Sequence, residues 1–149
     1  MNILVSACLL GLCTRYDGKA KPYPGVIELS KNHTLIPVCP EQLGGLATPR
    51  PPAEIQDDGR VINVLGEDVS AAFKLGAQMA LSIAQSTRCV FAILKSRSPS
   101  CGKGQVYDGS FQGVLKNGNG VFAALCVQNG LPIYTEDEVN DLSSPALNS

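Results

Sequence analysis

Short runs of aliphatic and β-branched residues recur along the chain, and each is bounded by turn-forming or charged residues. A continuous apolar run of this length is typical of a strand that is buried on both faces. The runs predicted to form strands are residues 3–7, 35–38, 90–94 and 131–134.

Helical spacing of apolar residues appears between these runs. The clearest helix is expected to begin near Asp68 as its N-cap, with apolar residues at intervals of three and four that define its buried face. Those positions are Val69, Ala72, Leu75, Met79 and Ile83. Shorter helices are predicted over residues 26–31, 121–128 and 136–142.

Strands that alternate with helices predict a mostly parallel sheet that is covered on both faces. We therefore expect one Rossmann-like α/β domain of three layers over residues 1–149. The glycine- and proline-rich segment 44–59 is predicted to be an irregular lid or binding loop, and residues 61–65 to form a hairpin arm. Residues 143–149 are expected to be a flexible tail.

The composition is that of an ordinary globular protein, with 44% hydrophobic and 17% charged residues. The 12 basic and 13 acidic residues leave a net charge of −1, and no basic block indicates a nucleic-acid partner. No apolar stretch approaches the roughly 18 residues of a membrane helix, and the N-terminus lacks the basic start of a signal peptide. We therefore expect a cytoplasmic protein with no membrane or nucleic-acid partner.

Six cysteines are many for a protein of a reducing compartment, and three of them share one structural position. Cys8 and Cys39 directly follow predicted strands, and Cys101 lies in the loop after the third strand. The carboxyl ends of parallel strands meet at one rim, where α/β proteins bind ligands, so the three thiols are expected to meet there. The alternative is that they are buried cysteines that act as small apolar residues.

The remaining cysteines have other positions. Cys89 opens its strand at the opposite end, and Cys126 lies on an amphipathic helix, so both are predicted to be core residues. Cys13 lies in a turn, where it is either a spectator or a resolving thiol.

Three thiolates limit the kind of centre they can hold. Structural zinc prefers four protein ligands and catalytic zinc is usually histidine-rich, but His33, the one histidine, precedes its strand and lies at the wrong end. A four-iron cluster held by three cysteines leaves one iron open, and that iron is a Lewis acid with affinity for sulfur.

Distinctive motifs extend over nearly the whole chain. They are Ser6-Ala7-Cys8-Leu9-Leu10-Gly11, Arg15-Tyr16-Asp17-Gly18, Pro37-Val38-Cys39-Pro40-Glu41, Gly44-Gly45-Leu46, Pro49-Arg50-Pro51-Pro52-Ala53-Glu54, Leu94-Lys95, Ser98-Pro99-Ser100-Cys101-Gly102 and Tyr107-Asp108-Gly109, then Phe111 and Gly113. Together these segments resemble a family long catalogued as a domain of unknown function, which includes thiouracil desulfidase. Many relatives carry a cysteine at the position of Thr14, one residue after Cys13, so Cys13 is a poor candidate for an essential ligand.

The resemblance implies a [4Fe-4S] cluster on Cys8, Cys39 and Cys101 and the non-redox removal of sulfur from a thiolated nucleobase. In the resulting hypothesis, the thione sulfur of 2-thiouracil binds the open iron, water adds at the same ring carbon, and uracil and hydrogen sulfide are released. The implied partner is a small-molecule thiolated nucleobase, and the protein is expected to be a monomer or a homodimer.

Glu41 is the carboxylate best placed to act as acid and base in such a reaction, although a glutamate here also suits a helix N-terminus. Ser98 and Ser100 either contact the pyrimidine or water, or are ordinary turn residues. Lys95, which follows a buried strand, is expected to offset the charge of the centre, and Arg50 and Arg97 are expected either to do the same or to remain solvated. Two rival functions remain open, a metal-free sulfur-transfer enzyme that uses a cysteine persulfide and a cluster-binding sensor without turnover.

Overall fold

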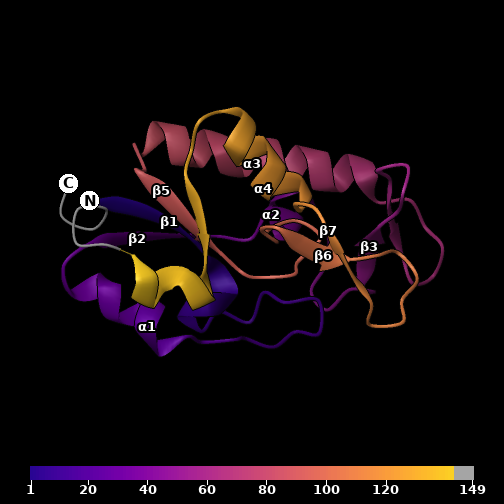
Figure 1. Ribbon diagram of the computed structural model, residues 1–149, viewed down its shortest axis with the longest axis horizontal. Helices are drawn as coiled ribbons and strands as arrows, with labels where there is room; N and C mark the ends of the chain where they lie inside the picture. The colour runs from indigo at the N-terminus through magenta and orange to yellow at the C-terminus, as the bar shows by residue number, and fades with distance from the viewer. Residues whose placement is uncertain (143–149) are drawn as a thin grey trace.

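A four-stranded, entirely parallel sheet forms the centre of the molecule (Figure 1), seen in a computed structural model that describes residues 1–142. The strands lie in the order β2-β1-β5-β8. Their bounds are β1 (Asn2–Ser6), β2 (Thr34–Val38), β5 (Phe91–Leu94) and β8 (Ile133–Thr135). The predicted α/β class with a mostly parallel sheet is therefore confirmed, whereas the tail predicted at 143–149 lies outside the described residues.

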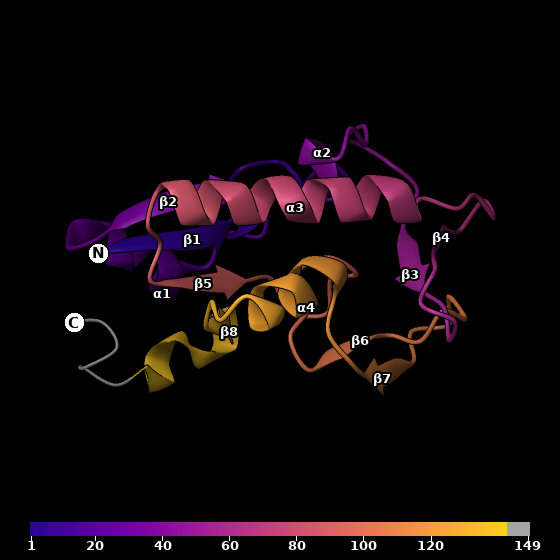
Figure 2. The ribbon, with the colours of Figure 1, turned by 90° about the horizontal axis from the view of Figure 1, so that it is seen from above.

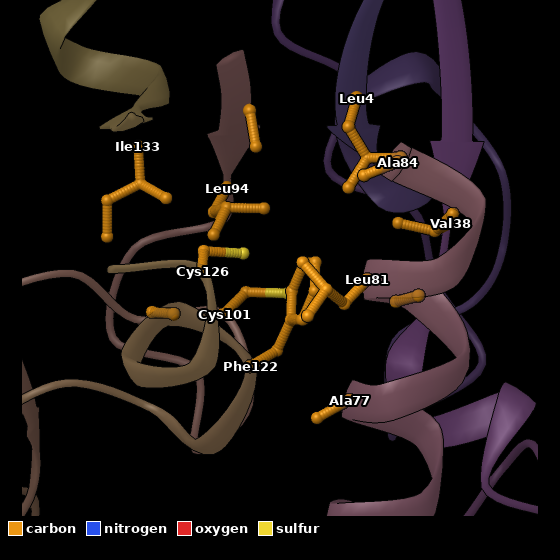
Figure 3. Packing of buried hydrophobic residues seen from close by; sticks show 13 residues of the cluster. Leu4, Val38, Ala77, Leu81, Ala84, Leu94, Cys101, Phe122, Cys126 and Ile133 are labelled. Carbon is orange, nitrogen blue, oxygen red and sulfur yellow. The ribbon is translucent and has the colours of Figure 1, made fainter. Parts of the chain in front are cut away.

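Helices cover both faces of this sheet and complete the three layers (Figure 1). One face carries α2 (Pro40–Leu43), α3 (Ser70–Ser86) and α4 (Val121–Gln128), and the other carries α1 (Pro24–Ile27) with the 3-10 helices η2 (Glu28–Lys31) and η3 (Glu136–Asp141). The central strands β1 and β5 bury both of their faces: Leu4 of β1 packs under α3 and α4, and Ile3 and Val5 pack on the opposite side. Figure 3 shows the α3–α4 side of this core. No helix in residues 1–142 is long and apolar enough to cross a membrane.

The order of the strands creates a switch point beside β1. The chain passes from β1 to β2 on one side and then returns to β5 on the other, so the loops that leave β1 and β5 diverge. Crevices at such points, outside the carboxyl ends of the strands, are the usual ligand sites of open α/β sheets. The fold thus leaves its opening at the rim where the sequence places the three cysteines.

Two antiparallel hairpins lie beyond this carboxyl-end rim (Figure 2). The first joins β3 (Ala53–Ile55) to β4 (Val61–Asn63), which agrees with the hairpin arm predicted at 61–65. The second joins β6 (Gln105–Tyr107) to β7 (Leu115–Asn117), in a segment whose glycines predict only irregular chain. The hairpins supply walls that the sheet alone does not have.

The buried face predicted for α3 is partly wrong. Leu75 and Met79 are exposed, at 50% and 41%, and the helix begins at Ser70, whose N–H donates to Asp68. The residues that face the core are Phe73, Gly76, Ala77, Ala80, Leu81 and Ala84. Four of these six are alanine or glycine in a helix that packs against both α2 and α4, so close approach of backbones, and not side-chain size, selects the buried face.

Candidate functional site

The structure brings Cys8, Cys39 and Cys101 to one cavity of about 520 Å³ at the carboxyl-end rim. Cys8 lies in the 3-10 turn η1 (Ala7–Leu10) directly after β1, and Cys39 lies between β2 and α2. Cys101 follows β5 in the loop that leads to the second hairpin. Three strand ends therefore each contribute one free thiol to the same lining.

Burial makes two of these thiols, those of Cys8 and Cys101, reluctant to ionise in the absence of a bound cation. Burial raises the pKa of the Cys8 thiol to about 11 and that of the Cys101 thiol well above its usual range. The neighbouring Cys39 adds to both increases, which shows that the three sulfurs influence one another. Lys95 and Arg15 act in the opposite direction on Cys8. A metal centre would bind here by displacing protons from the thiols.

A buried arginine connects the second cysteine to the candidate acid and base. The Arg50 side chain is only 5% exposed, and its Nη2 donates to Glu41 Oε2 at 3.0 Å and to the carbonyl of Thr14 at 2.9 Å. The same nitrogen lies 3.9 Å from Cys39 Sγ, and the Cys39 thiol points to the Thr14 carbonyl at 3.7 Å. Arg50 is thus not solvated, and it fixes the carboxylate beside the thiol.

Close backbone packing holds α2, and with it Cys39 and Glu41, in place. A Cβ at Gly76 of α3 would lie 1.7 Å from the carbonyl oxygen of Pro40, and a Cβ at Gly44 would lie 2.0 Å from the carbonyl oxygen of Ala72. Glycine at both positions lets the two helices meet backbone to backbone.

The loop that carries Cys101 is folded by its own serines. Ser98 Oγ lines the cavity region and accepts hydrogen bonds from the N–H groups of Ser100 and Cys101 at 3.1 and 3.0 Å, as expected for a turn residue. Ser100 lies deeper: it is 1% exposed, it is absent from the cavity lining, and its Oγ has no partner within residues 1–142. Its carbonyl accepts the N–H groups of Phe122 and Ala123 and so ties the loop to the start of α4.

A second charge pair lies under the loop after β5. Lys95 Nζ lies 3.3 Å from Glu136 Oε2, and Glu136 also accepts the N–H of Ser96 at 2.8 Å although its side chain is only 6% exposed. Ser6 Oγ accepts the N–H of Lys95 at 2.9 Å and lowers the pKa of Cys101, against the dominant effect of burial. These bonds connect the carboxyl ends of β1, β5 and β8 to one another at the base of the cavity.

Comparison with known proteins agrees with this geometry. The family model described as 2-thiouracil desulfurase matches residues 3–138. The chain belongs to this family. It is 38% identical to an uncharacterized protein, YbbK, of Bacillus subtilis, over 94% of this chain and 99% of that one. It is also similar to a solved structure described as the [4Fe-4S]-dependent thiouracil desulfidase TudS, with 40% identity, a TM-score of 0.87, and coverage of 99% of this chain and 97% of that one.

Every residue that lines the cavity lies within the part of the chain that matches the 2-thiouracil desulfurase family. The other cysteines lie elsewhere. Cys13 is exposed and outside the lining, whereas Thr14 belongs to the lining. Cys126 is a fully buried residue of α4 that faces the core, and Cys89 is half-buried at the amino end of β5. The predicted core position of Cys126 is confirmed.

Sequence reasoning missed three residues that shape this desulfurase-family site. Ser6 and Glu136 anchor Lys95, and Glu54 of the first hairpin lines the cavity. Ser6 and Glu54 both lie inside motifs that resemble the family, which was the available signal. Glu136 had none, because a glutamate at the start of a predicted helix is expected to be solvated.

Proposed function

We propose that this chain removes sulfur from a thiolated pyrimidine such as 2-thiouracil, with a [4Fe-4S] cluster held by Cys8, Cys39 and Cys101. The observation that carries the proposal is the convergence of three thiols from three strand ends on one cavity. Water supplies the oxygen that replaces sulfur, so 2-thiouracil and water give uracil and hydrogen sulfide, and no electron donor is needed.

The donor set fits a cluster better than a single ion. Within residues 1–142, no three histidine, cysteine, aspartate or glutamate side chains gather closely enough to hold one metal ion. A cluster is held by thiolates on separate irons, and Cys8, Cys39 and Cys101 would supply three of them from the walls of one cavity. When bound, it would supply a Lewis acid with affinity for the sulfur of the substrate.

The charges around the cavity suit an anionic centre. Three thiolates would give the cluster a net negative charge, and four cations line the same cavity: Arg15, Arg50, Lys95 and Arg97. Lys95 lowers the pKa of Cys8 against the effect of burial, so it favours the thiolate that a metal ligand must be.

Burial of the thiols weakens the rival sulfur-transfer mechanism. A persulfide enzyme needs a thiolate nucleophile near neutral pH without help from a metal. With its pKa raised to about 11, Cys8 is protonated under those conditions in the metal-free protein, and Cys101 is shifted in the same direction. These cysteines are better suited to be ligands than to be nucleophiles.

Glu41 is proposed to exchange protons with the attacking water and the departing sulfur. Arg50 takes up Oε2, while Oε1 accepts no hydrogen bond from residues 1–142 and is free to move a proton. Ser98 and Ser100 remain candidates to assist. In this conformation Ser98 Oγ already accepts hydrogen bonds from two backbone N–H groups, so it would act towards the substrate or water as a hydrogen-bond donor through its hydroxyl proton.

The test is anaerobic purification and reconstitution, followed by measurement of iron, sulfide and uracil. The expected protein is coloured, contains about four irons per chain, and releases equal amounts of uracil and sulfide from 2-thiouracil. Cys101→Ser should lose iron and turnover, and Cys13→Ser should keep both because Cys13 is exposed and outside the cavity lining. Turnover by iron-free protein would overturn the cluster, and a cluster-loaded protein that is inert towards a panel of thiolated bases would support the sensor function.

A further inference from the structure

Phe111 occupies an unusual position at the cavity. It lies in the loop between β6 and β7, lines the same cavity as the three cysteines, and has a left-handed backbone with φ of 57°. A bulky side chain rarely adopts this conformation, and the conformation persists only where the surroundings hold it. The ring is therefore placed at the cavity by contacts that hold the backbone of the loop.

Glu54 of β3 makes those contacts. Its Oε1 accepts the N–H of Gly109 at 2.9 Å and the N–H of Phe111 at 3.1 Å, across more than fifty residues of chain. Gln56 Nε2 donates to the carbonyl of Gly109 at 3.2 Å, and the N–H of Asp108 donates to the carbonyl of Val114 at 2.9 Å to close the loop. The first hairpin thus clamps the loop of the second one.

We propose that the pyrimidine ring of the substrate stacks on Phe111, and that Glu54 is the positioning residue that presents the Phe111 ring. This proposal rests on the proposed function. The charged groups of the cavity, Lys95, Arg50 and Glu41, serve the polar edge of a base and the reacting centre. An aromatic side chain offers a surface to the apolar faces of a planar ring, whichever base is bound. Tyr16, Tyr107 and Phe111 line the cavity, and of these three Phe111 is the one whose left-handed backbone is clamped by the other hairpin.

Stacking on Phe111 makes a prediction about ligand shape. Uracil is planar and conjugated, whereas 5,6-dihydrouracil carries the same polar edge on a puckered, saturated ring. Hydrogen bonds to the polar edge do not distinguish uracil from dihydrouracil, whereas a surface that stacks on the ring binds the planar one more tightly. The protein is therefore expected to bind uracil about tenfold more tightly than dihydrouracil.

The experiment is calorimetric titration of the cluster-loaded protein with uracil and with dihydrouracil. In Phe111→Leu the preference for the planar ring should fall close to one, through weaker binding of uracil, while Phe111→Tyr should keep it. Val114→Ala is the matched control, because Val114 lies in the same loop but is 50% exposed and outside the cavity lining. An unchanged preference in Phe111→Leu would overturn the proposal.

Glu54 is tested through the same ratio. Glu54→Ala should reduce the preference as far as Phe111→Leu does, Glu54→Gln should restore part of it because an amide oxygen can accept the same N–H groups, and the double variant should be no worse than either single one. A structural role alone would lower stability and affinity for both ligands and leave their ratio intact, which would refute the positioning role.

The two proposals fail separately. Absence of sulfide release from 2-thiouracil by the wild-type protein overturns the proposed function, whatever the ligands do. Sulfide release together with a ring preference that survives Phe111→Leu overturns only the stacking.

Discussion

The two ends of the parallel sheet each carry a hollow lined by cysteine, and they differ in what surrounds the sulfur. At the carboxyl end three cysteines line a cavity of about 520 Å³. Five charged residues from the segments that resemble the family line it with them: Arg15, Glu41, Arg50, Glu54 and Lys95. At the amino end a hollow of about 300 Å³ is lined by Cys89, Arg88 and mainly small or apolar residues. There the Cys89 sulfur lies 3.3 Å from the hydroxyl of Thr87, a neighbour in sequence.

The difference teaches that topology, and not cysteine content, distinguishes the proposed metal site from the hollow at the amino end. In a parallel α/β fold the carboxyl ends of strands meet helix N-termini, and here α2 begins just after Cys39 and α4 begins against the Cys101 loop. The amino-end hollow instead meets the last turns of α3 and α4. Helix N-termini carry partial positive charge and C-termini partial negative charge, so the helix ends place opposite partial charges beside the two hollows.

The most direct way to break this comparison is to remove one thiol from each end. Cys39→Ser should abolish iron binding and desulfuration, whereas Cys89→Ser should leave both unchanged because Cys89 has no second cysteine beside it in its hollow. Iron content and the visible spectrum of anaerobically reconstituted protein measure the effect. Loss of iron in Cys89→Ser would erase the distinction between the two ends.

The charges at the carboxyl end provide the next test. Glu41→Gln keeps the shape of the side chain and removes the proton-exchanging group, so we expect kcat to fall about 10²–10⁴-fold with the cluster retained. The matched control is Glu28→Gln, since Glu28 is exposed and pairs only with Lys31. Rates of sulfide release, normalised to bound iron, give the answer, and full activity in Glu41→Gln would remove its proposed role.

Helix α3 contacts α2 at the carboxyl end through its first half and lines the amino-end hollow with its last turns. A substitution in its first half therefore sharpens the comparison. Gly76→Ala should destabilise the protein by about 3 kcal/mol, because the new Cβ meets the Pro40 carbonyl and pushes α2 and Cys39 outward. Ser82→Ala, on the exposed side of the same helix, should be nearly neutral. Thermal unfolding and iron content should both respond to Gly76→Ala, and a stable variant with full iron would show that α2 is not held by this contact.

The smallest expected effect concerns a buried thiol that lies at neither rim. Burial raises the pKa of Cys126 to about 12, with no cation nearby to oppose it as Lys95 does at Cys8. Above about pH 9 the unfolded chain releases the proton of this thiol while the folded state keeps it. The contribution of the thiol to the stability of the fold is therefore complete below about pH 9 and declines as the pH rises towards 12. When the pH is raised from 8 to 10.5, the free energy of unfolding should decrease in both metal-free proteins. The decrease should be about 2 kcal/mol smaller in Cys126→Ala than in the wild type. Urea unfolding at the two pH values tests this, and equal losses in the two proteins would contradict it.

Much of the fold was predictable because its strands are local features. Each sheet strand is a short, mainly apolar run, and burial on both faces explains why the central strands β1 and β5 do not alternate with polar residues. The error on α3 arose because Leu75 and Met79 fit a helical period while the true contact face is built from small residues. The second hairpin was missed because its strands, Gln105–Tyr107 and Leu115–Asn117, are only three residues long and flanked by glycine.

The site divides in the same way. The three cysteines were recognisable from their places after strands, and Glu41 from its distance to Cys39. The roles available to Ser98 and Ser100 were not, since only the folded loop shows one hydroxyl on two N–H groups and the other buried away from the cavity. For Arg50, the sequence left open whether it offsets the charge of the centre or remains solvated, and its packing against Thr14 and Glu41 shows that it is not solvated.

The sequence by itself determined where the thiols lie relative to the strands, because the direction of a parallel strand assigns the residue after it to one rim. The tertiary structure alone decided which charges meet them. Glu54 reaches Phe111, and Glu136 reaches Lys95, across stretches of chain whose separation carries no local signal. Such pairs depend on how loops from different strands come together, and that is settled only when the two faces of the sheet are covered.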